Sequence, residues 1–184
     1  EKFIEELTKV EEIDIPETLN AQLRPYQERG YKWLYTNTQK SLGSCLADDM
    51  GLGKTIQVLS LILKLKEDNR LDQPALVVCP TTLIGNWYKE CEKFTPKLNV
   101  YIYYGTERKF LTKGKDIIIT SYGTLRKDVE RFKTKKWSLA IIDEAQNIKN
   151  PDTDQTKAVK QLSAGAFIAM SGTPVENRLS ELWS

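Results

Sequence analysis

One stretch decides the fold of this chain: Leu46-Ala47-Asp48-Asp49-Met50-Gly51-Leu52-Gly53-Lys54-Thr55-Ile56-Gln57. Residues 44–47 are small and apolar enough to form a short buried strand, and residues 54–66 are helix formers with many apolar side chains. A strand, a glycine-containing loop, Lys-Thr and a helix, in this order, are typical of a phosphate-binding loop. The stretch therefore predicts an α/β fold that binds a nucleotide at this loop.

The chemistry of phosphate binding explains these residue types. Glycines let backbone N–H groups point inward, the helix N-terminus adds the positive end of its dipole, and Lys54 supplies a mobile cation. Thr55 is expected to place its hydroxyl on the Mg²⁺ that accompanies the β- and γ-phosphates. The full pattern, however, has a glycine where this chain has Asp48. Because glycines at a strand-to-helix turn can serve geometry alone, the loop by itself leaves a purely structural role open.

A second signal lies at Ser138-Leu139-Ala140-Ile141-Ile142-Asp143-Glu144. An apolar strand that ends in Asp-Glu is the Walker B arrangement. Asp143 is expected to orient Mg²⁺ through its water shell, and Glu144 to position the attacking water or accept its proton. Such a strand is common on its own, but with the upstream loop in one βαβ pattern it predicts nucleotide hydrolysis. The adjacent Glu favours a hydrolase over a kinase, because a kinase must exclude water.

The remaining elements follow from runs of apolar residues. We expect strands at 75–79, 100–104, 116–120 and 166–170, and helices from Pro25, over 83–94 and over 125–132. In the helix from Pro25, one face is expected to hold Tyr26, Gly30, Trp33 and Leu34. The continuous apolar strand at 75–79, between two helices, is typical of a parallel β-sheet with helices on both faces.

Composition limits the class of protein. Hydrophobic residues make up 40% of the 184 residues and charged residues 28%, which is typical of a soluble globular domain. No apolar run is long enough to span a bilayer, and no signal-peptide pattern opens the chain. We expect no membrane partner and an intracellular location, in the cytoplasm or, in a eukaryote, in the nucleus.

Histidine is absent, and the chain has three cysteines, Cys45, Cys79 and Cys91. Without histidine, neither a Cys/His metal site nor a Cys-His nucleophile can be built. The cysteines are expected to be buried and to act as small hydrophobic residues. Acid–base chemistry must come from carboxylates, because the commonest general base is missing.

Charge divides the chain into two parts. Residues 1–19 hold seven acidic residues and two lysines, a net charge of −5, so the remainder carries +7 to give the total of +2. We interpret 1–19 as an N-terminal arm with a short amphipathic helix, and 20–184 as one domain whose basic balance is compatible with a polyanionic partner. Residues 173–176 fit the capping box of a final helix, and the chain stops inside it, so we expect a piece of a longer protein.

The order of these motifs resembles the first RecA-like lobe of superfamily-two helicases, and within them the SWI/SNF-type DNA-translocating ATPases, which include Rad-type recombination motors. The resemblance covers about residues 23–184. Leu23-Arg24-Pro25-Tyr26-Gln27 looks like the family's adenine-side motif, which implies that Gln27 reads the base. Residues 48–55 look like its motif I, in which an acidic residue at the position of Asp48 is usual. The implied ATP-binding residues there are Asp48, Asp49, Met50, Gly51, Leu52, Gly53, Lys54 and Thr55.

Two further segments resemble the family's nucleic-acid-facing motifs. Pro80-Thr81-Thr82 with Asn86-Trp87 and Glu90 resembles motif Ia, and Thr120-Ser121-Tyr122 with Arg126-Lys127-Asp128 resembles the next motif. Hydroxyls and backbone N–H groups at strand ends suit phosphate contacts that do not read bases, and such binding is sensitive to salt. Each residue singly is equally well explained as part of a capped helix start. The implied nucleic-acid contacts are Thr81, Thr82, Ser121, Tyr122, Arg126 and Lys127.

A third group resembles the segments that couple ATP to DNA. Asp143-Glu144-Ala145-Gln146 stands where most of the family has Asp-Glu-Ala-His, and Ser171-Gly172-Thr173-Pro174 resembles motif III. Gln146 departs from the family, and its amide can bridge by hydrogen bonds but cannot carry a proton. The resemblance implies that Gln146, Ser171 and Thr173 couple ATP to DNA. We expect the amide of Gln146 to tune this coupling differently and ATP hydrolysis to be retained.

The resemblance implies a RecA-like P-loop NTPase lobe that binds ATP and Mg²⁺ and belongs to a double-stranded-DNA-dependent ATPase, a translocase that remodels protein–DNA complexes. The second RecA-like lobe of the same chain would supply an arginine finger. Two alternatives stay open: a superfamily-two helicase that depends on RNA or single strands, and a nucleotide-binding module without hydrolysis. The module is disfavoured because Thr55 and the implied catalytic residues Lys54, Asp143 and Glu144 are all present. A GTPase is disfavoured because no Asn-Lys-x-Asp motif appears.

Overall fold

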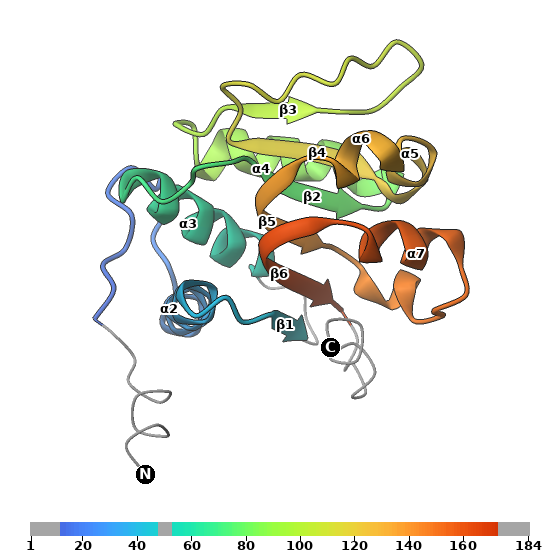
Figure 1. The fold of residues 1–184 in the computed structure, drawn as a ribbon. Helices are drawn as coiled ribbons and strands as arrows, with labels where there is room; N and C mark the ends of the chain where they lie inside the picture. The colour runs from blue at the N-terminus through green and yellow to red at the C-terminus, as the bar shows by residue number, and fades with distance from the viewer. Residues whose placement is uncertain (1–11, 48–52, 173–184) are drawn as a thin grey trace.

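The computed structural model describes residues 12–47 and 53–172 (Figure 1). Several sequence predictions fall outside these ranges: the amphipathic helix of the arm, loop residues 48–52, Thr173 and the capping box at 173–176. The described chain forms one sheet between two layers of helices (Figure 1).

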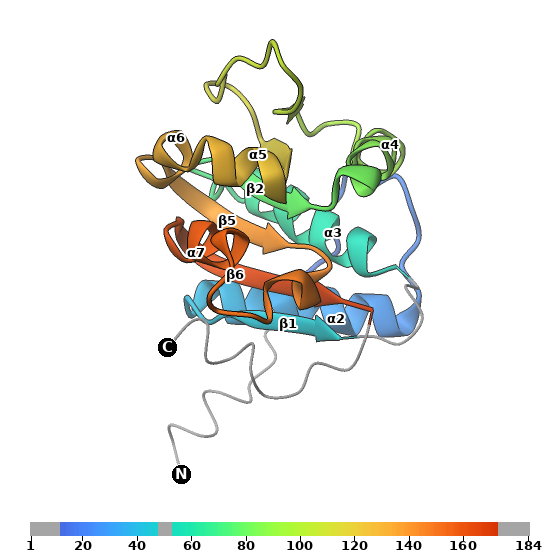
Figure 2. The same ribbon diagram turned by 90° about the vertical axis from the view of Figure 1, so that its right-hand side faces the viewer.

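Six strands form the sheet, in the order β1-β6-β5-β2-β4-β3, and every neighbouring pair is parallel. Their bounds are β1 Ser44–Ala47, β2 Ala75–Cys79, β3 Val100–Ile102, β4 Ile117–Ser121, β5 Lys136–Ile142 and β6 Ser163–Ser171. The predicted parallel α/β sheet is confirmed. Because all the strands run the same way, all of them end at one edge of the sheet, as Figure 2 shows for β1, β6, β5 and β2.

The helices divide between the two faces of the sheet. One face is covered by α2 Pro25–Gln39, α3 Lys54–Glu67 and α4 Ile84–Phe94, the last preceded by the short 3₁₀ helix η1 Thr81–Leu83. The other face is covered by α5 Tyr122–Lys127, α6 Val129–Lys133, the 3₁₀ helix η2 Ala145–Ile148 and α7 Asp154–Lys160. None of the helices within the described ranges combines the length and the apolar character that a bilayer crossing requires.

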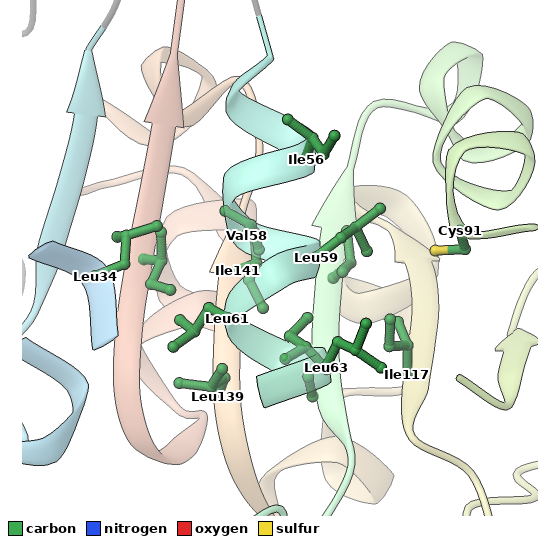
Figure 3. Packing of buried hydrophobic residues seen from close by; sticks show 14 of the residues in the cluster. Leu34, Ile56, Val58, Leu59, Leu61, Leu63, Cys91, Ile117, Leu139 and Ile141 are labelled. Carbon is green, nitrogen blue, oxygen red and sulfur yellow. The ribbon is translucent and has the colours of Figure 1, made fainter. Parts of the chain in front are cut away.

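Successive side chains along each strand point to opposite faces of the sheet, which produces two hydrophobic clusters. In β2, Ala75, Val77 and Cys79 face the layer of α2, α3 and α4, whereas Leu76 and Val78 face the opposite layer. Helix α3 lies over the centre of the first cluster, and its buried side chains on both sides, among them Ile56, Val58, Leu59, Leu61 and Leu63, belong to this cluster (Figure 3). A helix that is apolar almost all round is stable only when buried, so the helix after the predicted phosphate loop is held rigidly at the centre of the sheet.

One predicted burial pattern is wrong. Cys45 is exposed, unlike Cys79 and Cys91, because β1 is an edge strand and its face at this residue is open. On the predicted face of α2, Leu34 is buried whereas Trp33 is 45% exposed. A Cβ at Gly30 would lie 1.8 Å from Gln57 Oε1, so α2 and α3 approach each other closely at this glycine.

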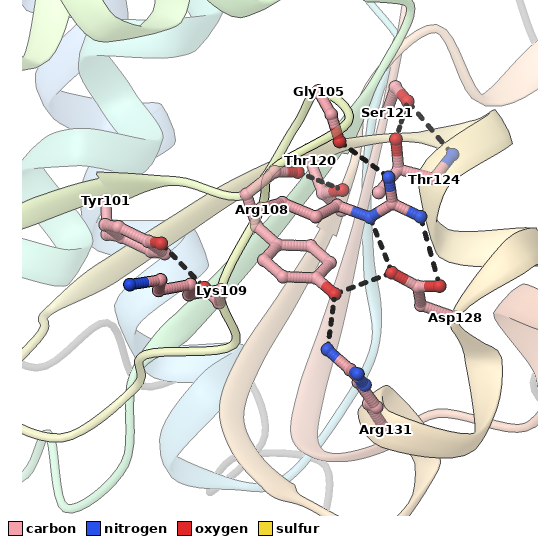
Figure 4. A network of polar contacts seen from close by, with 10 residues as sticks. Tyr101, Gly105, Arg108, Lys109, Thr120, Ser121, Thr124, Asp128 and Arg131 are labelled. Atoms are coloured by element: carbon pink, nitrogen blue, oxygen red, sulfur yellow. Dashed lines mark hydrogen bonds and ion pairs between the residues drawn. The ribbon is translucent and has the colours of Figure 1, made fainter.

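The predicted helix at 125–132 is also wrong, because it is divided at Asp128 into α5 and α6. The carboxylate of Asp128 accepts hydrogen bonds from the Tyr103 hydroxyl at 2.6 Å and from Arg108 Nε at 2.6 Å (Figure 4). A second bond from Arg108 Nη2, at 3.2 Å, makes the ion pair bidentate. These bonds come from the connection between β3 and β4, and they draw Asp128 out of helical geometry. Hydrogen bonds from Arg108 lower the pKa of the Asp128 carboxyl.

We predict that Asp128→Asn lowers the free energy of unfolding at pH 7, because the charged acceptor of Arg108 is lost. The folded-state pKa of Asp128 lies below its unfolded value of about 3.9. The stability that the charge contributes is therefore present above that unfolded value and is lost as the pH falls through the folded-state pKa. The difference between the two proteins should shrink between pH 6 and pH 3, measured by urea denaturation.

The exposed carboxylate of Asp72 supplies the control. Asp72→Asn should leave the free energy of unfolding close to that of the unchanged protein across this pH range. A difference for Asp128→Asn that stays constant as the pH falls would contradict the role given to its charge.

Candidate functional site

The edge at which the strands end brings the predicted motifs together. Helix α3 begins just after β1, the Asp-Glu pair follows β5, and η1 follows β2. Across the sheet from β1 to β4, this edge carries Lys54, Ser171, Asp143, Glu144, Thr81 and Ser121. Parallel α/β sheets bind their ligands at this edge, so the arrangement is that of a binding site.

Lys54 is the first residue of α3 and is buried, with 8% of its surface exposed. Its Nζ atom donates a hydrogen bond to the backbone carbonyl of Ser171 at 2.8 Å. The contact joins two segments that are far apart in sequence, the start of α3 and the end of β6. A buried ammonium is costly unless it has a polar partner, and this carbonyl supplies one.

Gly53 is required for two separate reasons. Its φ of 84° lies in the left-handed region, which a glycine adopts without strain. A Cβ at this position would also lie 2.0 Å from Gln27 Nε2. The amide of Gln27 is therefore packed against the start of α3, and its Oε1 accepts a hydrogen bond from the Arg24 N–H at 2.9 Å. Gln27 is buried next to the phosphate loop and does not face solvent.

Asp143 is held on several sides. Its Oδ2 accepts a hydrogen bond from the indole N–H of Trp87 at 2.8 Å, and its Oδ1 accepts one from the N–H of Glu144 at 2.8 Å. The hydroxyl of Tyr122 donates to the backbone carbonyl of Asp143 at 2.5 Å. Burial raises the pKa of Asp143, and the bonds from Trp87 and the Glu144 amide oppose this shift. The carboxylate is therefore fixed in position, and only 9% of the residue's surface is exposed.

Glu144 begins a chain of hydrogen bonds that returns to Lys54. Its φ of 52° and ψ of 51° place it in the left-handed region, which is uncommon for a residue with a side chain. The amide of Gln146 donates to Glu144 Oε2, and Gln146 Oε1 accepts a hydrogen bond from the Ser171 hydroxyl at 2.9 Å. Since the carbonyl of Ser171 accepts from Lys54, the amide at position 146 links the Asp-Glu motif to the end of β6.

Two residues of α4 lie near the site, although the sequence analysis assigned them no individual role. The indole N–H of Trp87 donates to Asp143, and Glu90 has a buried Oε2 atom with no hydrogen-bond partner among the described residues. Burial is the main cause that raises the pKa of Glu90. A signal for Glu90 was available, because a carboxylate three residues after a buried aromatic lies on the same side of a helix.

The six residues predicted to contact nucleic acid fall into two groups. Ser121 and Tyr122 are buried and engaged inside the protein, since the Ser121 hydroxyl accepts from the Thr124 N–H at 3.1 Å and Tyr122 bonds to Asp143. The other four are exposed: Thr81, Thr82, Arg126 and Lys127. The side chains of these four residues are therefore accessible to a nucleic acid at the surface.

We predict that Gly53→Ala lowers the free energy of unfolding by about 2 kcal/mol or more. A left-handed backbone costs a residue with a Cβ about 1–2 kcal/mol, and the contact with Gln27 adds to this cost. Urea denaturation, followed by far-UV circular dichroism, measures the change.

Gly114→Ala is the matched control, because Gly114 has a φ of 74° and its Cβ would meet nothing within 4 Å. Its loss in the free energy of unfolding should come from the left-handed backbone alone. The excess cost at Gly53 should disappear when Gln27→Ala is added to Gly53→Ala. Equal losses at the two glycines would contradict the packing of Gln27 against Gly53.

Comparison with known proteins gives a family match over most of the chain. The family described as SNF2-related domain matches residues 26–184. The protein YwqA of Bacillus subtilis, whose name describes it provisionally as an ATP-dependent helicase/translocase, is 42% identical over 99% of this chain. Helicase ssl-1 of Caenorhabditis elegans is 39% identical over 92% of the chain. The chain spans 21% and 7% of the length of these two relatives.

A solved structure gives the same result for the fold. The SWI2/SNF2 ATPase core of Sulfolobus solfataricus, solved in complex with double-stranded DNA, is 43% identical and superposes with a TM-score of 0.84. The match covers 91% of this chain and 36% of that one. The family match, the identities and the shared RecA-like fold agree, and the chain belongs to the SNF2-related domain family.

Proposed function

We propose that this chain is the ATP-binding lobe of a double-stranded-DNA-dependent ATPase, a translocase that remodels protein–DNA complexes. The observation that carries the proposal is the contact of the buried Lys54 ammonium with the Ser171 carbonyl, one strand away from Asp143 and Glu144. It gathers a cation and two carboxylates at the edge where α/β sheets bind ligands. Family membership and the likeness to an ATPase core solved with double-stranded DNA add support.

The proposed lobe consists of residues 20–184, with residues 1–19 as an arm. The described part of this arm packs on the lobe, since Ile13 is buried in the first hydrophobic cluster and the Tyr31 hydroxyl donates to the Asp14 carbonyl at 2.7 Å. A second RecA-like lobe in a longer chain would complete the active site with an arginine finger. The small share of the Sulfolobus core that this chain spans, 36%, supports this division. The proposed location follows from the DNA partner: the cytoplasm or, in a eukaryote, the nucleus.

Thr55 and Asp143 are the residues that would hold Mg²⁺, and their chemistry fits this ion. Hydroxyl and carboxylate oxygens are the hard ligands that Mg²⁺ prefers. Each Asp143 oxygen accepts a hydrogen bond through one lone pair and has another for a hydrated cation. Within the described ranges, no cluster of three or more His, Cys, Asp or Glu side chains could hold a metal by itself. The residues therefore fit an ion that is held largely by phosphates and water.

The proposed roles of the site residues follow from their contacts. Gln27 would hold the base, while residues 48–53 and Lys54 would hold the phosphates. Lys54 would exchange the Ser171 carbonyl for phosphate oxygens, so its ammonium keeps an acceptor throughout. Glu144, oriented by Gln146, would position the attacking water and accept its proton. Mg²⁺, when bound, neutralises charge on the phosphates.

The proposed DNA contacts are made to the phosphate backbone. Thr81, Thr82, Arg126 and Lys127 would contact it, because their side chains are exposed just after β2 and in α5. For Ser121 and Tyr122 we propose a supporting role, since their side chains hold the start of α5 in place. Contacts of this kind release counterions from DNA, so the affinity should fall steeply with salt. Ser171 and Gln146 are the proposed coupling residues, together with Thr173 outside the described ranges.

We predict that Glu144→Gln in the full-length protein lowers ATP turnover at least 100-fold with little change in ATP affinity. The amide keeps the size of the side chain and removes the group that accepts a proton. Turnover is measured by phosphate release, and affinity by the fluorescence of a labelled ATP. Lys54→Ala is the comparison and should lose affinity. A parallel loss of affinity in Glu144→Gln would contradict the assigned role.

The experiment that tests the proposed function is ATP hydrolysis by the full-length protein, titrated with duplex DNA, single-stranded DNA and RNA. We expect selective stimulation by duplex DNA that weakens as salt increases. Stimulation by RNA or single strands would replace the translocase with a superfamily-two helicase. Nucleotide binding without turnover under any condition would indicate a non-hydrolysing module.

A further inference from the structure

The side-chain amide of Gln27 is held at both of its ends. Its Oε1 accepts a hydrogen bond from the backbone N–H of Arg24 at 2.9 Å. Its Nε2 lies at the start of α3, because a Cβ at Gly53 would be 2.0 Å from this atom. A backbone N–H can only donate, so the amide atom that faces it must be the oxygen. The backbone of Arg24 therefore sets which end of the amide points to Gly53.

The geometry of a helix start explains only one of these two contacts. Arg24 is the N-cap of α2, and Gln27 stands at the third helical position, from which a side chain can bond to the N-cap N–H. This capping bond uses the amide oxygen alone. Among the described residues, none accepts a hydrogen bond from Nε2, although only 9% of the surface of Gln27 is exposed. A nearly buried donor without an acceptor in this part of the chain is available to a ligand.

Two reciprocal contacts between α2 and α3 fix the place of the Gln27 side chain. Gln27 of α2 fills the space beside Gly53, and Gln57 of α3 fills the space beside Gly30, where a Cβ would lie 1.8 Å from Gln57 Oε1. Gly30 follows Gln27 by three residues, which places both on one side of α2. Gln57 follows Gly53 by four residues, which places both on one side of α3. The amide of Gln27 therefore has little room to move sideways.

The segment before α2 holds the backbone of Arg24 by contacts that do not involve Gln27. Leu23 is 7% exposed and belongs to the first hydrophobic cluster. The backbone N–H of Asn20 donates to the carbonyl of Phe94, the last residue of α4, at 2.8 Å. The N–H of Arg24 is thus presented to Gln27 by a segment that is anchored on the layer of α2, α3 and α4.

An amide fixed in this orientation suits adenine better than a base with a carbonyl at position 6. Adenine offers N7 as an acceptor and its N6 amino group as a donor, and a glutamine amide can bond to both. Nε2 would donate to N7, and the second lone pair of Oε1 would accept from the amino group. Guanine and hypoxanthine carry O6 in place of the amino group, so Oε1 would face another acceptor. Turning the amide by 180° would set its nitrogen against the Arg24 N–H, donor against donor.

We propose that the backbone N–H of Arg24 determines nucleotide specificity, because it keeps the Gln27 amide in the orientation that accepts adenine and rejects a carbonyl at position 6. Arg24 acts through Gln27 and is therefore a positioning residue. The inference rests on the proposed function, in which Gln27 holds the base, and adds the group that decides between bases. Since this group belongs to the backbone, the side chain at position 24 is not needed for it.

The test uses the full-length protein and measures how well ADP and inosine diphosphate (IDP) displace a fluorescent ADP. IDP keeps N7 and carries O6 in place of the amino group. The unchanged protein should prefer ADP about 10-fold or more, as expected for a bidentate contact to the base. Because only binding is measured, the result does not depend on ATP turnover.

Arg24→Pro removes the N–H and suits the local backbone. The φ of −69° at Arg24 is the angle that proline adopts, and the ψ of 156° suits a residue that precedes Pro25. The preference for ADP over IDP should fall at least threefold in this variant. ADP should bind more weakly, because its amide partner is no longer fixed, whereas IDP should bind equally well or more tightly. A general loosening of α2 would instead weaken both nucleotides by the same factor.

Two further variants give the limits of the effect. Arg24→Ala is the matched control, because it removes the exposed side chain and keeps the backbone N–H. It should keep the affinities for ADP and IDP. Gln27→Ala removes the whole amide and should bring the preference close to onefold.

The possible results separate the inference from the proposed function. If Arg24→Pro fails to fold, an α-hydroxy acid at position 24 replaces the N–H with an ester oxygen and removes the same bond without a proline ring. The inference is overturned if the protein without this N–H keeps the full preference or weakens both nucleotides equally. It is also overturned if Arg24→Ala loses the preference, or if the unchanged protein binds ADP and IDP equally. Absence of ADP binding in the unchanged protein would instead overturn the proposed function.

Discussion

The bond between the Lys54 ammonium and the Ser171 carbonyl, 2.8 Å long, is the interaction on which the site depends. A buried ammonium without a partner destabilises the fold by several kcal/mol, so Lys54 needs an acceptor before any phosphate is bound. The end of β6 provides it. Because β6 lies between β1 and β5, this strand positions both the lysine that follows β1 and the carboxylates that follow β5. A phosphate at the same place would replace one acceptor with another.

The elements predicted well from the sequence are those whose burial follows from their own run of apolar residues. β2 is apolar at every position and α3 is apolar almost all round, so each has only one stable environment, the centre of a two-faced α/β sheet. The errors at Asp128 and Cys45 have a different origin. Asp128 bonds to Arg108 in the connection between β3 and β4, and Cys45 lies on an edge strand. These outcomes depend on tertiary neighbours, which a local pattern does not contain.

The same distinction holds at the candidate site. Gly53, Lys54 and the Asp-Glu pair were predictable, because phosphate chemistry demands these residue types next to a strand end. The hydrogen-bond partners were not predictable. An amide at position 146 is compatible with many networks, and only the fold brings it between Glu144 and Ser171. Tyr122 had the chemistry of a surface contact, yet its hydroxyl is used to hold the backbone of Asp143.

Asp143 is contacted by both segments that carry the proposed DNA contacts, the one after β2 and the one after β4. The segment after β2 reaches its carboxylate through Trp87, and the segment after β4 reaches its backbone through Tyr122. The strands that precede these segments, β2 and β4, lie on the same side of β5, in the order β5, β2, β4. This order places the proposed DNA contacts on one side of the Asp-Glu pair and the lysine on the other. Each of the two segments therefore reaches Asp143 through a direct hydrogen bond, one to its carboxylate and one to its backbone carbonyl.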